Sequence, residues 1–95
     1  MEWQVKVHRR AYRFLEDLPE DRRRLVEEKL RELVEALEHG VLPYRRLDIH
    51  RLRGIWEGFL RLRIGDIRVI FRLDFGNKIV YVYNIHYRKS VYKYK

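Results

Sequence analysis

The hydrophobic pattern of the chain is most regular in residues 59–73, FLRLRIGDIRVIFRL, where apolar and charged positions alternate. The pair Gly65-Asp66 lies at the middle of this stretch, and a Gly-X pair supplies the positive φ that a two-residue hairpin turn requires. A turn at this pair places apolar residues opposite each other: Ile64 with Ile67, Leu62 with Val69, and Leu60 with Phe71. The two strands and the turn therefore agree on one register.

The same register gathers arginines on the second face of the hairpin. It places Arg63 opposite Arg68, Arg61 opposite Ile70, and Phe59 opposite Arg72. Long charged side chains are ordinary on the solvated face of an antiparallel sheet, so a wet surface is one interpretation. Like charges directly across a strand pair destabilise a sheet, however, and a bound anion would relieve that repulsion.

The segment before the hairpin predicts one strand and two helices. Residues 2–8 alternate with Trp3, Val5 and Val7 on one side, which predicts a half-buried strand. Residues 9–18 predict a short helix that ends at Pro19, a residue that can also begin the next helix. Its apolar face contains Ala11, Phe14, Leu15 and Leu18.

Residues 20–39 form the longest periodic stretch and predict a second helix. Its core-facing stripe contains Leu25, Val26, Leu30, Leu33, Val34 and Leu37. Gly40 is expected just after the helix, at the position that favours a left-handed backbone. The short link between the two helices predicts an antiparallel helical hairpin.

Residues 41–58 contain Pro43, Gly54 and Gly58 and are expected to form a connection without regular structure. After the hairpin, a turn around Gly76-Asn77 leads to a last strand at residues 78–85, apolar enough to lie inside the sheet. With a two- or four-residue turn, Val80 and Val82 join the core while Tyr81 and Tyr83 join the arginine face. A three-residue turn would exchange them. Residues 86–95 form a basic, tyrosine-rich tail.

The elements follow the order β-α-α-β-β-β, which predicts an α+β fold. The helical hairpin is expected to pack on one face of a mainly antiparallel, twisted sheet, with the arginines on the opposite face. Ninety-five residues suit a single hydrophobic core, so we expect one domain at residues 1–95.

The net charge of +8 lies entirely in the second half of the chain. Residues 1–50 carry 11 basic and 11 acidic residues, whereas residues 51–95 carry 11 basic residues against 3 acidic ones, Glu57, Asp66 and Asp74. A positive field confined to the half that contains the sheet predicts a polyanionic partner such as nucleic acid or an acidic peptide.

Several classes of chemistry lack their residues. There is no cysteine, Ser90 is the only serine, and no glycine-rich phosphate loop is present. The histidines at 8, 39, 50 and 86 show no metal-ligand spacing, so neither a metal nor another cofactor is expected. No apolar run approaches the roughly 20 residues of a membrane span. The absence of cysteine and of a signal peptide suits a cytoplasmic protein without a membrane partner.

Arginines, tyrosines and His86 are left near one end of the sheet. Arginine binds phosphate through a bidentate fork and stabilises charge developing on a phosphorane. Tyrosine stacks on bases or transfers protons. Such a site could cleave RNA if the 2′-OH of the RNA is the nucleophile, or it could only hold nucleic acid. Composition does not separate these two functions.

The stretch Leu52-Arg53-Gly54, followed by residues 59–71, resembles the signature of the RelE/ParE toxin superfamily. The order of elements and the Arg-x-x-x-Tyr ending at Arg88 and Tyr92 resemble this superfamily too, so the likeness covers essentially the whole chain. It is most similar to archaeal RelE proteins. Phe59 stands where bacterial members have a lysine.

The resemblance implies the toxin of a type II toxin–antitoxin system, which cleaves mRNA in the ribosomal A site through 2′-OH attack. It implies a cytoplasmic hetero-oligomer with a RelB-like antitoxin, and the ribosome and mRNA as further partners. Arg61 and Arg63 would clamp phosphate, Arg68 would stabilise the developing charge, and Arg88 would assist the leaving group or the phosphorane.

Tyr92 would stack on a base or act as the general base, with His86, Tyr87 and Tyr94 as substitutes. Besides Arg61 and Arg63, four other basic residues are expected to contact RNA: Arg53, Arg72, Lys89 and Lys93. Two other functions remain open. One is a ParE-like toxin that acts on DNA gyrase, and the other is a non-catalytic RNA-binding module of the same fold.

Overall fold

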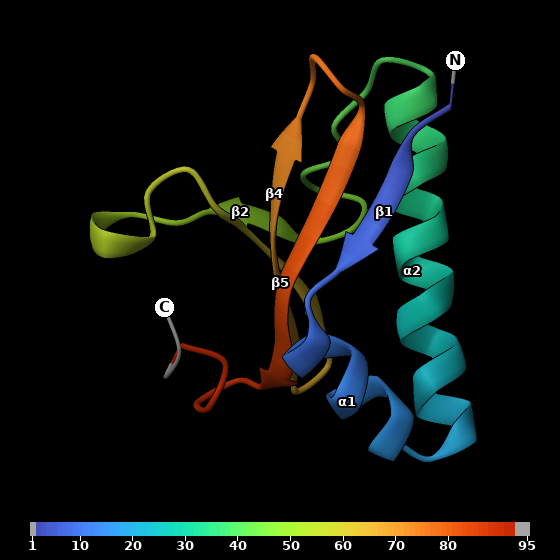
Figure 1. Cartoon of the computed structure of the whole chain (residues 1–95), viewed down its shortest axis with the longest axis vertical. Helices are drawn as coiled ribbons and strands as arrows, with labels where there is room; N and C mark the ends of the chain where they lie inside the picture. Colours follow the sequence, from blue (N-terminus) through green and yellow to red (C-terminus); the bar gives the residue numbers. More distant parts are fainter. Residues whose placement is uncertain (1, 93–95) are drawn as a thin grey trace.

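The structure, a computed structural model, describes residues 2–92, which form one five-stranded sheet with two α-helices on one side of it (Figure 1). The elements are β1 (Gln4–Val7), α1 (Arg9–Asp17), α2 (Glu20–Glu38), β2 (Ile49–Arg51), the 3₁₀ helix η1 (Gly54–Trp56), β3 (Leu60–Ile64), β4 (Ile67–Asp74) and β5 (Ile79–Tyr87). The strands lie in the order β1-β5-β4-β3-β2, so β4 is central.

The predicted α+β fold is confirmed, with one strand added to it. β1 runs parallel to β5, and every other neighbouring pair is antiparallel. The added strand is β2, in the segment 41–58 that we expected to be irregular. Three residues are too few to show a period of two, and β2 exists because Ile49 pairs with Leu62 and is itself buried.

The predicted register of the β3–β4 hairpin is confirmed. Ile64 pairs with Ile67 next to the turn, and Arg63 pairs with Arg68 one step further from it. Gly65 has a φ of 61°, a left-handed conformation that glycine adopts without the steric cost of a Cβ. One face of the hairpin therefore enters the core between the sheet and the helices.

The core lies between the sheet and both helices, and two details of its composition differ from expectation. Leu25 is 45% exposed, because neighbouring helix positions point about 100° apart and Val26 takes the inward direction. Val5 and Val7 are also exposed, since β1 is an edge strand, while Trp3 just before it is buried. The first strand is thus less buried than its alternation predicted.

The end of α2 confirms the role expected of Gly40. Its φ is 76°, its N–H donates to the Leu37 carbonyl at 2.9 Å, and the N–H of Val41 donates to the Ala36 carbonyl at 2.9 Å. These two bonds satisfy carbonyls that the end of a helix otherwise leaves unpaired. The chain then turns back toward the sheet.

The turn between β4 and β5 contains the four residues 75–78, because Asp74 pairs with Ile79. Val80 and Val82 accordingly lie in the core, as the four-residue alternative predicted. Tyr81 pairs with Arg72 and so lies on the arginine face. Asn77 holds the turn closed, since its backbone N–H and its side-chain amide donate to the Asp74 carboxylate at 3.0 and 2.9 Å.

A β-bulge at Tyr83 changes the sidedness of the second half of β5. Ile70 pairs with Asn84 and Phe71 pairs with Val82, so Tyr83 is the extra residue between them. Beyond the bulge, Ile85 faces the core and Asn84 faces the opposite side. An uninterrupted alternation would have reversed these two positions.

The hydrogen bonds from Asn77 lower the pKa of Asp74 below its ordinary value. A depressed carboxyl pKa adds stability above the unfolded pKa, and this stability is lost as the pH falls through the folded pKa. We expect Asn77→Ala to raise the pKa of Asp74 toward its ordinary value and to weaken the acid dependence of unfolding. Carboxyl ¹³C NMR titration measures this, and an unchanged titration would contradict the assignment.

Candidate functional site

Arg68 is the centre of a group of arginines on the second face of the sheet. We call Arg61, Arg63, Arg68 and Arg88 the arginine cluster. It lies on the central strand with Arg63 across from it on β3 and His86 across from it on β5. Only 9% of Arg68 is exposed. Its Nη1 donates to the carbonyls of Gly65 at 2.7 Å and Ile67 at 3.2 Å, so backbone oxygens, and no carboxylate of residues 2–92, orient this guanidinium.

The four other predicted catalytic residues all lie close enough to Arg68 to act on its charge. The pKa of Arg68 lies below its usual value, chiefly because burial penalises the charged form and then because Arg61 and Arg63 repel it. Arg88 adds a smaller repulsion, and Tyr92 acts in the opposite direction. Arginine stays charged in proteins, so the arrangement holds a destabilised cation that an anion would stabilise.

The carboxylate of Asp48 forms ion pairs with two of these arginines, Arg61 and Arg63. Its Oδ2 lies 3.1 Å from Arg63 Nε, and its Oδ1 lies 3.6 Å from Arg61 Nη2 and 3.2 Å from His50 Nε2. The Arg61 Nε is buried and has no hydrogen-bond partner among the described residues. The cluster therefore keeps an excess of positive charge and a buried donor.

A second apolar cluster covers part of the same face, around Ile70, which the predicted register had placed there among the arginines. Trp56, Ile70 and Val91 form its buried centre. The ring centre of Tyr92 lies 5.9 Å from that of Trp56, edge-on. The periodicity of single strands did not predict this cluster, because it joins η1, β4 and the turn after β5.

The turn after β5 is held on the sheet by Asn84 and Val91. Asn84 is 2% exposed, and its Nδ2 donates to the Val91 carbonyl at 2.8 Å. The N–H of Arg88 donates to the carbonyl of Asp66 in the hairpin turn at 2.9 Å. These contacts hold the turn in which Arg88 and Tyr92 lie, and both residues are near enough to act on the charge of Arg68. A lone asparagine in an apolar strand was the sequence signal that could have revealed this anchor.

The other predicted RNA-binding residues lie around the cluster. Arg53 is exposed just before η1, Lys89 is exposed in the turn after β5, and Arg72 is exposed on β4. Within residues 2–92 no hydrogen bond or ion pair connects Arg53 or Lys89 to Arg68. The predicted positions Lys93 and Tyr94 lie outside the described residues.

Two of the three suggested substitutes for Tyr92, His86 and Tyr87, pack against α1. The ring of His86 lies 4.8 Å from that of Phe14, and its Nδ1 accepts a hydrogen bond from the Tyr87 N–H at 2.9 Å. Tyr87 is exposed and lies 5.2 Å from Phe14, edge-on. The ring contacts with Phe14 join the end of β5 to α1. The hydrogen bond to the Tyr87 N–H uses Nδ1 of His86 and not Nε2.

Among residues 2–92, no three His, Asp or Glu side chains come together so that they could hold a metal ion. In the same part of the chain, neither α1 nor α2 is long and apolar enough to cross a membrane.

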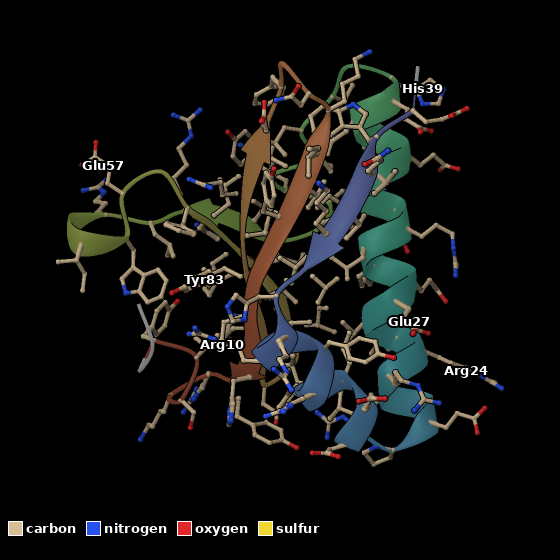
Figure 2. All side chains as sticks on the ribbon, viewed as in Figure 1. Arg10, Arg24, Glu27, His39, Glu57 and Tyr83 are labelled. Atoms are coloured by element: carbon tan, nitrogen blue, oxygen red, sulfur yellow. The ribbon has the colours of Figure 1, made fainter. Side chains whose placement is uncertain are left out.

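Figure 2 shows Tyr83 on the side of the sheet away from α2. Arg10 from α1 also reaches this ring, with a distance of 4.8 Å from its guanidinium carbon to the ring centre.

The sequence model for the ParE toxin of type II toxin–antitoxin systems matches residues 5–92. The chain belongs to this toxin family. The match includes every described residue of the arginine cluster and the turn that carries Arg88 and Tyr92.

Relatives within the RelE/ParE superfamily agree with this assignment. A protein named RelE1 from Methanocaldococcus jannaschii is 33% identical over 93 residues, which cover 98% of both chains. The solved archaeal RelE–RelB complex from Pyrococcus horikoshii is similar over 95% of this chain and 99% of that one, with 27% identity and a TM-score of 0.69. The predicted likeness to archaeal RelE proteins is confirmed.

A further solved structure supports the fold of this toxin family member. The RelBE2 toxin–antitoxin complex from Mycobacterium tuberculosis covers 93% of this chain and 100% of its own, with 22% identity and a TM-score of 0.73. At this identity the likeness concerns the arrangement of helices and strands only. The arginine cluster is observed in the structure of this chain and does not rest on that likeness.

We expect Asn84→Ala to loosen the turn after β5. The variant leaves the Val91 carbonyl without its donor, which costs about 1–3 kcal/mol for a buried polar group. Amide hydrogen exchange should accelerate at Val91, and the urea midpoint should fall. Gln4→Ala, which removes an exposed side-chain amide from β1, serves as the matched control. Unchanged exchange at Val91 would show that Asn84 does not anchor this turn.

Proposed function

We propose that this toxin family member is a ribosome-dependent endoribonuclease that cleaves mRNA in the A site. In this reaction the 2′-oxygen of one nucleotide attacks the adjacent phosphorus and loses its proton to a base. The bond from phosphorus to the 5′-oxygen then breaks, and that oxygen takes up a proton. The products are a 2′,3′-cyclic phosphate and a new 5′-hydroxyl end.

The observation that carries this proposal is the buried Arg68 among further cations on one sheet face. Arg61 and Arg63 would hold the phosphate, and Arg68 would stabilise the charge that grows on the phosphorane oxygens. A guanidinium that is already desolvated gains more from a developing anion than a hydrated one does. Arg88 would assist the leaving oxygen, and Tyr92 would take the proton from the 2′-OH or stack on a base.

The partner we propose is a RelB-like antitoxin. The solved complexes from Pyrococcus horikoshii and Mycobacterium tuberculosis each contain a toxin and its antitoxin. A chain with a net charge of +8 suits an acidic partner that neutralises the toxin in a hetero-oligomer. We further propose a cytoplasmic location, where ribosomes and mRNA are present.

The second candidate is a toxin that acts on DNA gyrase, because the matching family model is described as the ParE toxin. The crowded arginines favour the RNA function, since a protein target does not require a buried cation on an exposed sheet. A translation extract and a supercoiling assay separate the two candidates. Cleavage inside codons that depends on ribosomes supports the first, and loss of supercoiling supports the second.

We expect the double variant Arg68→Ala/Arg88→Ala to relieve growth arrest and to lower mRNA cleavage at least about a hundredfold, since each arginine stabilises the transition state. Arg31→Ala, which removes one exposed charge from α2, is the matched control and should cleave as the unchanged protein does. Primer extension on mRNA in the extract measures cleavage, and circular dichroism checks the fold. Undiminished toxicity of a folded double variant would refute the site.

Asp48→Asn tests whether the phosphate site is electrostatic. Asp48 has a φ of 54°, which asparagine tolerates, so the variant removes the charge and keeps the backbone. Freed from this carboxylate, Arg61 and Arg63 should bind single-stranded RNA several times more tightly. The slope of log affinity against log salt should steepen by about 0.7 for one added phosphate contact. Fluorescence anisotropy measures both, and equal or weaker binding would contradict the model.

A further inference from the structure

Cationic and aromatic side chains alternate across the second face of the sheet. Lys6 on β1 pairs with Tyr81 on β5, and Tyr81 pairs with Arg72 on β4. The Arg72 guanidinium carbon lies 5.5 Å from the centre of the Tyr81 ring and 5.8 Å from that of Phe59, which immediately precedes β3. These four residues form a row that crosses the sheet away from Arg68, and we call it the cation–aromatic row.

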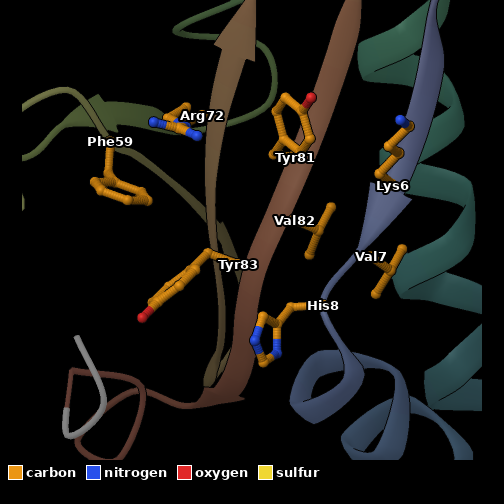
Figure 3. Close-up of a pocket in the computed structure, with 8 residues that line it drawn as sticks. All are labelled: Lys6, Val7, His8, Phe59, Arg72, Tyr81, Val82 and Tyr83. Carbon is orange, nitrogen blue, oxygen red and sulfur yellow. The ribbon is translucent and has the colours of Figure 1, made fainter.

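A pocket of about 370 Å³ opens along this row, and His8 and Tyr83 line it as well (Figure 3). The Tyr83 ring centre lies 5.4 Å from that of Phe59 and 5.6 Å from that of His8. The volume lies in the range of small-molecule sites, and aromatic rings with a few polar groups are the usual lining of such sites. The pocket therefore offers ring faces and positive charge together.

Arg72 is exposed, and after the hydrogen bonds from Asn77 its charge also contributes to lowering the pKa of Asp74, without an ion pair between the two side chains. Within residues 2–92 the Arg72 guanidinium makes no hydrogen bond and no ion pair, and it lies against the rings of Tyr81 and Phe59. The nearby Asp74 carboxylate is engaged by Asn77 at 2.9 and 3.0 Å. The N–H donors of Arg72 are consequently available to an acceptor outside the chain.

The chemistry of the row matches a nucleotide better than a peptide. Single-stranded nucleic acids bind to surfaces where bases stack on aromatic rings and cations follow the phosphates. An acidic peptide would use Lys6 and Arg72 but would not need three ring faces beside them. An uncharged apolar ligand would use the rings but not the cations.

The row also lies at a suitable distance from the arginine cluster. Arg68 and Arg72 are four residues apart on β4 and point to the same face, which separates them by about 13 Å along the strand. Ile70 lies between them beneath Trp56 and Val91, so an RNA strand gripped at Arg68 would pass over this apolar cluster to reach the row. Tyr83, the extra residue of the bulge, lines the pocket beside the row.

We infer that the cation–aromatic row is a second nucleotide-binding site, which holds a nucleotide of the RNA strand that flanks the cleaved one. The base stacks on Tyr81, and Arg72 and Lys6 hold its phosphate. This inference rests on the proposed RNA function and adds to it a contact that positions the strand. It assigns no chemical step to the row.

The test uses binding of RNA that the protein is unable to cleave. A single-stranded hexanucleotide with 2′-O-methyl groups lacks the nucleophile, so its affinity is independent of catalysis. The variants are Tyr81→Ala, Tyr81→Phe and Arg72→Ala in the full chain, all measured at one salt concentration. Tyr12→Ala and Arg31→Ala remove an exposed ring and an exposed charge from the helices and serve as matched controls.

We expect Tyr81→Ala and Arg72→Ala each to weaken binding about tenfold, the loss typical of one base stack or one charged contact. Tyr81→Phe keeps the ring and should bind as the unchanged protein does, as should both controls. In NMR titrations of the unchanged protein, the hexanucleotide should shift the amide signals of Lys6, Arg72 and Tyr81.

Three results would overturn the inference. The first is unchanged affinity in Tyr81→Ala and Arg72→Ala with amide shifts confined to the arginine cluster, which leaves the proposed function intact. The second is weaker binding of the antitoxin, but not of RNA, by these variants, which assigns the row to a protein partner. The third is no RNA binding by the unchanged protein, and the ribosome cleavage assay then judges the proposed function separately.

Discussion

The register of the β3–β4 hairpin is the constraint on which the rest of the structure depends. The left-handed Gly65 closes a two-residue turn, and pairing from that turn sends apolar residues to the helices and arginines to the other side. A slip of one residue would bury the arginines in the core, at a cost far above any gain from pairing. The register of this one hairpin therefore fixes both the core on one face of the sheet and the candidate site on the other.

Burial and mutual repulsion make the charges of the arginine cluster unfavourable, and nearby acceptors partly offset this. Arg68 has backbone carbonyls as acceptors, and Arg61 and Arg63 share the carboxylate of Asp48. The compensation is incomplete, since burial and repulsion both lower the pKa of Arg68. Incomplete neutralisation of desolvated cations is the condition under which an anionic transition state gains the most from binding.

The second apolar cluster converts a basic tail into part of the site. Val91 is fully buried against Trp56 and Ile70, and Asn84 holds its carbonyl. Without these contacts the residues after β5 would have only the bond from the Arg88 N–H to the Asp66 carbonyl and the bonds of a short turn. The bulge at Tyr83 is what makes the anchor possible, because it turns Asn84 to this face and returns Ile85 to the core. Packing on the far side of the sheet thus supports both the cluster and the cation–aromatic row.

The sequence by itself determined the hairpin, the two helices, the order of elements and the arginine face, because each depends on a local period or a local turn. It also placed Tyr81 correctly once the turn after β4 was taken as four residues. Only the tertiary structure decided the short strand β2, the bulge at Tyr83 and the packing of Val91 on Trp56. These features join segments far apart in the chain, and such pairing leaves no repeating pattern in any one of them.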